Sequence, residues 1–260
     1  MKAQITIFLI LIFGSLAAQN TDIKKIWVGN DLEYIKIDSQ SVLFEVFGEH
    51  YQSKKYYRIS DTLRLYDKYT TSTDNFSKQH TKNYDFLITK LTDRQLTLTP
   101  IESNALQLAG WKPEINYQER SLVKQSDIEF SKIIFRSTTC HGTCPSLTLQ
   151  IDKEKNLLFI GGMYAIKQGH YSGILSDSLL NSLVAILKLS EVDKLKTWEQ
   201  MVVDAPEYTL EIHYNDKVKY IKNFFLPSVT RELIQYLLEI SKKVELKEAK
   251  EPFAISFTKQ

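Results

Sequence analysis

The residue types most suited to chemistry lie in one short run. Cys140-His141-Gly142-Thr143-Cys144-Pro145 contains both cysteines of the 260-residue chain. Two thiols this close in sequence can form a disulfide, undergo redox chemistry or bind a metal. Gly142 and Pro145 disfavour a helix, so the run is expected to be a tight loop between two strands, residues 130–136 and 147–151.

The first interpretation is a structural disulfide between Cys140 and Cys144. An oxidising compartment favours this bond, and the chain-entropy model assigns about 2 kcal/mol to a ring this small. Gly142 would allow a positive φ if the ring requires one. The bond would then fix one turn of the chain.

Two other interpretations use the same residues. Redox-active pairs favour Cys-x-x-Cys at a helix N-terminus, which lowers the thiol pKa. Here the spacing is one residue longer and Pro145 leads into a strand. A metal site would use Cys140, His141 and Cys144, because thiolates and imidazole suit Zn²⁺ or Cu⁺. A fourth ligand would have to be a distant histidine or carboxylate, since the chain has no second cysteine pair.

The N-terminus has the pattern of a signal peptide. Met1-Lys2 is positively charged, residues 5–13 are apolar, and residues 14–18 supply the small side chains that a signal peptidase reads. The apolar run is shorter than the roughly 20 residues that a membrane-spanning helix needs. We therefore expect an exported protein, periplasmic or extracellular, without a membrane span once residues 1–18 are removed.

Charge and composition narrow the class of partner. The 33 basic and 31 acidic residues are interspersed, which argues against the strongly basic face that nucleic-acid binding requires. The 14 Tyr and 13 Phe, against 9 Gly, indicate a packed, strand-rich globular protein. A protein or a small ligand is the class of partner that this composition allows.

The sequence contains none of the common catalytic or cofactor motifs. His-Glu-x-x-His, Gly-x-Ser-x-Gly, the phosphate-binding loop and the dinucleotide fingerprint are all missing. The histidines are scattered, at His50, His80, His141, His170 and His213. We therefore assign no catalytic residue and expect no cofactor.

Residues 19–105 are predicted to form a β-rich domain. Short aromatic and β-branched runs between turn residues predict an antiparallel meander or small barrel. The predicted strands are residues 34–38, 42–47, 56–60, 63–68, 84–90 and 95–99. The longest connection is residues 70–83. Residues 106–126 are expected to be an irregular linker, with Trp111-Lys112-Pro113 able to pack against either domain.

Residues 127–260 are predicted to form an α+β domain, an antiparallel sheet with two helices on one face. Further strands are expected at residues 157–161, 208–214 and 217–223, and an edge strand at 253–257. Apolar stripes predict helices at residues 177–189, with Ser176 as the N-cap, and 228–243. The segment around His170, residues 169–173, is expected to be a flexible connection.

Two hairpins in this half share a motif. Residues 145–151 and 206–212 both read Pro-x-x-Thr-Leu-x-Ile. One hypothesis is an internal duplication, in which each half contributes two strands and a covering helix. The alternative is that amphipathic strands share this alternation by chance. A duplication requires the two hairpins to superpose together with their helices.

The run from Arg136 through the cysteine motif to Ile151, followed by Phe159-Ile160-Gly161, resembles an uncharacterised domain of exported bacterial proteins, the domain of unknown function 6438. The resemblance covers about residues 128–243 and rests on the pattern Cys, aromatic, Gly, any residue, Cys, Pro. His141 stands where the family usually has the aromatic residue, which argues against a ligand role for it. The resemblance implies export and a small α+β domain, and no activity.

These observations together favour a non-catalytic exported binding or structural module, stabilised by a local disulfide. The alternatives are a thiol redox protein and a Cys/His metal-binding protein.

Overall fold

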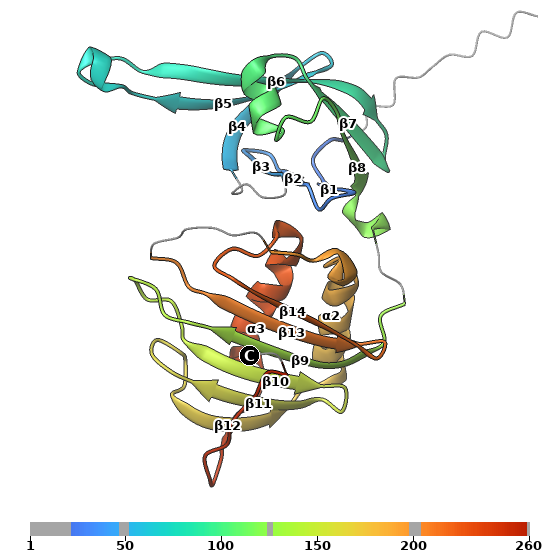
Figure 1. The fold of residues 1–260 in the computed structure, drawn as a ribbon, viewed down its shortest axis with the longest axis vertical. Helices are drawn as coiled ribbons and strands as arrows, with labels where there is room; N and C mark the ends of the chain where they lie inside the picture. The colour runs from blue at the N-terminus through green and yellow to red at the C-terminus, as the bar shows by residue number, and fades with distance from the viewer. Residues whose placement is uncertain (1–21, 47–51, 124–126, 198–203, 259–260) are drawn as a thin grey trace, which may run out of the picture.

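The computed structural model describes residues 22–46, 52–123, 127–197 and 204–258. Within these residues, eight strands form a closed antiparallel barrel, and seven form an antiparallel sheet with two main helices (Figure 1). The predicted class, α+β with a β-rich N-terminal part, is confirmed. The predicted signal peptide, residues 1–18, lies outside the described residues.

The barrel follows chain order, and its last strand pairs with its first. Its strands are β1 (Ile26–Gly29), β2 (Tyr34–Ile37), β3 (Val42–Glu45), β4 (Gln52–Ile59), β5 (Thr62–Tyr69), β6 (His80–Leu91), β7 (Gln95–Pro100) and β8 (Ile115–Glu119). Alternate side chains point inward. The core that they form includes Trp27, Phe44, Phe86, Leu96 and Tyr117.

The segment expected to be an irregular linker contributes to the barrel instead. It contains the second half of helix α1 (Ser103–Leu108) and all of β8, which pairs with both β7 and β1. Ile115 and Tyr117 of β8 are buried in the barrel core. Trp111 is 68% exposed. Strand β8 was missed because its alternation spans only five residues after a Pro-containing turn.

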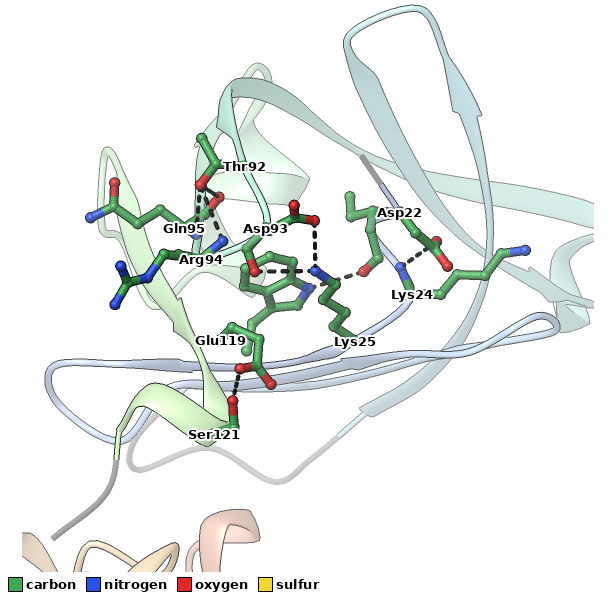
Figure 2. Close-up of polar contacts among 11 residues, drawn as sticks. Asp22, Lys24, Lys25, Thr92, Asp93, Arg94, Gln95, Glu119 and Ser121 are labelled. Atoms are coloured by element: carbon green, nitrogen blue, oxygen red, sulfur yellow. Dashed lines mark hydrogen bonds and ion pairs between the residues drawn. The ribbon is translucent and has the colours of Figure 1, made fainter. Parts of the chain in front are cut away.

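Polar contacts hold the N-terminal segment to the end of the barrel (Figure 2). Lys25 Nζ donates to the backbone oxygen and to a carboxylate oxygen of Asp93, both at 3.1 Å. The Thr92 hydroxyl accepts from the amide of Gln95 at 2.9 Å and shapes the β6–β7 turn. The indole Nε1 of Trp27 donates to the Ile23 carbonyl at 2.9 Å. These bonds hold β1 in the position in which it pairs with β8.

Strands β5 and β6 continue beyond the barrel as a hairpin arm (Figure 1). Because β6 already begins at His80, the connection between these two strands is shorter than the predicted residues 70–83. The tip contains the 3₁₀ turn η1 (Ser72–Asp74), followed by Asn75 and Phe76 in the left-handed region. Phe76, with φ 58°, is 65% exposed.

The C-terminal sheet has the order β14-β13-β9-β10-β11-β12-β15. Its strands are β9 (Phe130–Ser137), β10 (Leu147–Asp152), β11 (Asn156–Gly161), β12 (Gly169–Ile174), β13 (Tyr208–Tyr214), β14 (Lys217–Asn223) and β15 (Lys247–Glu248). The strands predicted at residues 130–136, 147–151, 157–161, 208–214 and 217–223 are all present. Strand β12 was expected to be a flexible connection because it contains two glycines. It instead pairs along its whole length with β11.

Two helices cover one face of this sheet. They are α2 (Asp177–Lys188) and α3 (Arg231–Lys243), the latter preceded by the 3₁₀ turn η4 (Ser228–Thr230). Ser176 caps α2 as predicted, its hydroxyl accepting from the Leu179 amide at 3.3 Å. Tyr236 Oη of α3 donates to the Leu179 carbonyl at 2.7 Å and joins the two helices. No helix in the described part of the chain is long and apolar enough to cross a membrane.

The two Thr-Leu-x-Ile motifs lie on either side of strand β9 in matching register. Leu149 of β10 and Leu210 of β13 both pair with Phe135. However, β11 lies on the side of β10 away from β9, and β14 lies on the side of β13 away from β9. The second strands of the two hairpins therefore lie toward opposite edges of the sheet, whereas α2 and α3 cover the same face. Such units have opposite handedness and cannot be superposed together with their helices. The topology therefore contradicts the duplication hypothesis.

The C-terminal segment crosses the sheet face opposite the helices, because it contacts His170 and Glu211, whose neighbours along β12 and β13 pack in the core on the helical side. The Phe253 amide donates to His170 Nδ1 at 3.3 Å, and the Thr258 amide donates to Glu211 at 2.8 Å. Ile255 between them is buried. The predicted edge strand at 253–257 is therefore wrong, and β15 takes the sheet edge.

Candidate binding cavity beside the disulfide

Cys140 and Cys144 form a disulfide in the loop between β9 and β10, with their Cα atoms 5.5 Å apart. This separation lies within the usual range for such bonds. Both cysteines are partly exposed. The Gly142 amide donates to Cys140 Sγ at 3.3 Å. Gly142 does not adopt a positive φ, so the ring closes without the conformational freedom expected of that glycine.

The disulfide loop is attached to the segment that leads into β13. The Thr138 amide donates to the Glu207 carbonyl at 3.1 Å, and the Glu207 amide donates back to the Thr138 hydroxyl at 2.9 Å. Further along the loop, His141 Nδ1 lies 3.3 Å from a carboxylate oxygen of Asp204. The loop and this segment therefore form one continuous wall.

The residues proposed as metal ligands do not form a metal site. The two sulfur atoms are bonded to each other, so neither is a thiolate. His141 is largely exposed, with a single acidic neighbour among the ion pairs of the described chain. Across residues 22–46, 52–123, 127–197 and 204–258, no three His, Cys, Asp or Glu side chains are placed to hold a metal ion.

A cavity of about 670 Å³ opens next to the disulfide loop. Thr143 and Pro145 of the cysteine motif form part of its wall. Most of its other walls are apolar and come from the β11–β12 loop, the start of β13, the segment that follows β14 and helix α3. They include Leu147, Tyr164, Ile166, Pro206, Tyr208, Phe224, Phe225, Leu226, Ile234 and Leu238. Gln235, Glu239 and Lys242 add polar groups from α3.

The barrel contributes one polar group to this cavity, the carboxylate of Glu45. Glu45 is 4% exposed and accepts two hydrogen bonds from Ser228, one from its amide at 2.9 Å and one from its hydroxyl. Burial raises the pKa of Glu45, and the bonds from Ser228 offset part of this rise. Glu45 thus joins the barrel to the start of α3 at the edge of the cavity.

Buried Arg120 makes a second connection between the barrel and α3. Its guanidinium lies 2.9 Å from a Glu232 carboxylate oxygen and donates to the Val229 carbonyl at 3.3 Å. Val28, Leu32 and Tyr34 of the barrel are part of the same apolar core as the helices. The barrel and the sheet therefore pack against each other, which fixes the position of Glu45 relative to the cavity.

The remaining predicted residues lie elsewhere. His170 is in β12 beneath the C-terminal segment. His213 lies on the same face of the sheet, with its Nε2 atom 2.6 Å from a carboxylate oxygen of Glu211. Neither histidine lines the cavity. Sequence reasoning identified only Thr143 and Pro145 of its wall. The paired prolines Pro145 and Pro206 were visible in the repeated motif, and both line the cavity.

The fold and this site define a class: a β-rich α+β protein in which a closed antiparallel barrel packs on an antiparallel sheet with a helical layer and a disulfide-linked loop. Residues 131–244 match the profile of DUF6438, a domain of unknown function. The chain therefore contains a DUF6438 domain, close to the boundaries expected from the sequence. Comparison with curated proteins and with solved structures gives no match.

Proposed function

We propose that this protein is an exported, non-catalytic binding module that takes up a small apolar molecule with a polar end in the cavity beside the disulfide. The cavity itself is the observation that carries the proposal. Its volume of about 670 Å³ lies within the roughly 300–1,000 Å³ range of small-molecule sites. A predominantly apolar lining that also contains polar groups is typical of such sites.

The disulfide has a specific role in this proposal. Thr143 and Pro145 belong to the wall, and Cys144 lies between them. Holding the loop closed restricts the positions that these two residues can adopt before a ligand binds. Preorganisation of this kind reduces the entropy lost on binding. The oxidising compartment expected from the signal peptide would keep the bond formed.

The apolar exposed side chains beside the cavity support the same function. Tyr164 and Ile166 in the β11–β12 loop line the cavity and are 52% and 59% exposed, and neighbouring Met163 is 58% exposed. Contiguous exposed apolar side chains are characteristic of interaction sites. An apolar ligand would cover part of this surface.

Titration with the neutral fluorophore N-phenyl-1-naphthylamine tests the proposal. We expect saturable fluorescence enhancement with the wild-type protein and its loss in Leu238→Trp, which fills the cavity from α3. Ile174→Trp is the matched control, because Ile174 is an exposed apolar residue of β12 that does not line the cavity. Equal binding by Leu238→Trp, or no saturable binding by the wild type, would contradict the proposal.

A second candidate function is thiol–disulfide exchange. It is favoured by the partial exposure of both cysteines and by the Gly142 amide, which donates to Cys140 Sγ and would stabilise a thiolate there. An insulin-reduction assay with dithiothreitol separates the two functions. Turnover that is lost in Cys140→Ser supports exchange, whereas no turnover above that of Cys140→Ser rejects it.

A further inference from the structure

A second cavity, separate from the disulfide, lies on the barrel next to helix α1. Its volume is about 330 Å³, and it is lined by Gln52, Lys82, Tyr84, Asn104, Gln107, Leu108, Gly110 and Trp111. Three side-chain amides among so few residues give this cavity a different character from the apolar cavity beside the disulfide. Each amide offers both donors and an acceptor.

Trp111 stands at this cavity with most of its surface in solvent. It is 68% exposed, although a tryptophan of a folded protein is usually well buried. Its backbone has φ 65° and follows Gly110 with φ 62°. A bulky residue in the left-handed region is an outlier, and such backbone conformations cluster at functional sites.

The neighbouring residues hold Trp111 in this conformation. Its amide donates to the Leu106 carbonyl at 2.8 Å, past the end of α1. On its other side, Lys112 makes ion pairs with Asp31 and with Glu33 of the barrel. These contacts hold the backbone at Trp111, and the side chain remains largely exposed instead of packing into the core.

The floor of the cavity is also ordered by contacts. Tyr84 is 8% exposed and donates from its hydroxyl to Asp67 at 3.1 Å. The ammonium groups of Lys54 and Lys82 lie 4.4 and 5.3 Å from the centre of its ring. Asn104 Nδ2 lies 3.5 Å from the Asn83 carbonyl. Among the described residues, those that line this cavity include no carboxylate.

We propose that this cavity binds a carbohydrate, with Trp111 as the stacking platform for a sugar ring. A pyranose ring has an apolar face of C–H groups, which an exposed indole matches, and a rim of hydroxyls that need both donors and acceptors. Gln52, Asn104 and Gln107 supply these in one place. An apolar ligand would leave the amides without hydrogen bonds.

The test measures intrinsic tryptophan fluorescence during titration with cellotetraose, chitotetraose, xylotetraose and mannotetraose at millimolar concentration. We expect at least one of them to give a saturable change that is missing in Trp111→Phe, a variant that keeps the other two tryptophans of the chain, Trp27 and Trp198. Isothermal titration of the same sugar should show binding at least about tenfold weaker in Trp111→Ala and in Gln107→Ala, as expected for losing a central contact.

Phe76→Ala is the matched control, since Phe76 is also an exposed aromatic residue with positive φ but lies at the tip of the hairpin arm. It should bind the sugar as the wild type does. Thermal unfolding of each variant shows whether it is folded. The proposal is overturned if none of the four sugars gives a saturable change, or if binding survives in folded Trp111→Ala.

Discussion

Glu45 of the barrel accepts hydrogen bonds from both the amide and the hydroxyl of Ser228, at the start of η4 and ahead of α3. A carboxylate at this position satisfies an amide that the helical turn leaves without a partner. The residues are 183 positions apart in sequence. This contact places a buried charge at the junction of the barrel, the helical layer and the cavity.

Replacing Glu45 should change how stability depends on pH. Burial raises the pKa of Glu45 above its ordinary value of 4.5, so the folded state holds this proton more tightly than the unfolded state does. The contribution of Glu45 to stability therefore falls as the pH rises from about 4.5 through the higher folded-state pKa. Urea unfolding at several pH values should show that Glu45→Gln removes this fall. An unchanged pH profile would contradict the assignment.

Glu45→Ala should be more damaging than Glu45→Gln. Alanine leaves the buried amide and hydroxyl of Ser228 without an acceptor, and an unsatisfied buried group costs about 1–3 kcal/mol. Glutamine keeps a carbonyl oxygen at the same position. Free energies of unfolding at neutral pH decide the order, and equal values for the two variants would show that the hydrogen bonds to Ser228 contribute little.

Glu211 should show the opposite pH dependence. Burial acts to raise its pKa, but the hydrogen bonds from His213 and Thr258 outweigh burial and lower the pKa below 4.5. The contribution of Glu211 to stability is therefore present above pH 4.5 and is lost as the pH falls through the folded-state pKa. Glu211→Gln should be destabilising at neutral pH, and its difference from the wild type should shrink in acid. A difference that grows in acid would exclude this explanation.

Breaking the disulfide should weaken both the fold and the cavity. The chain-entropy model gives about 2 kcal/mol for a ring of this size, so Cys140→Ser with Cys144→Ser should lower the free energy of unfolding by about that amount. Binding of N-phenyl-1-naphthylamine should weaken as well, because Thr143 and Pro145 gain freedom. Reductant should reproduce both effects in the wild type and leave the double variant unchanged.

The C-terminal segment should contribute to stability through its apolar contact with the sheet. Ile255 is buried. Ile134 of β9 is also buried, but it does not belong to the core on the helical side of the sheet. Ile255→Ala should lower the free energy of unfolding by about 2 kcal/mol, the lower end for such a deletion. Ser256→Ala is the control, since Ser256 is exposed. If the two variants unfold alike, the segment does not cover the sheet in solution.

Local patterns predicted many of the elements but not their partners. Strands β13 and β14 agree residue for residue with the sequence prediction, because the Asn215-Asp216 turn marks where one strand ends and the next begins. The segment 253–257 alternates too, yet it crosses a sheet face instead of joining an edge. Alternation indicates that one side of a segment is buried, but it does not show which element covers that side.

The cavity beside the disulfide could be predicted only in part. The spacing of Cys140 and Cys144 was sufficient to suggest a disulfide. The facing wall comes from α3 and from the segment that follows β14, and the pairing of β9 with β13 brings it close to the loop. Glu45, which also lines the cavity, belongs to β3 of the barrel. Contacts of such long sequence separation leave no local pattern.

The central claim is that the cavity beside the disulfide binds an apolar ligand, and methyl-resolved NMR during titration with N-phenyl-1-naphthylamine tests it most directly. We expect saturable shifts at the methyl groups of Leu147, Ile234 and Leu238, with those of Leu63 and Leu98 in the barrel core unchanged. Shifts confined to the barrel, or scattered shifts that do not saturate, would contradict it.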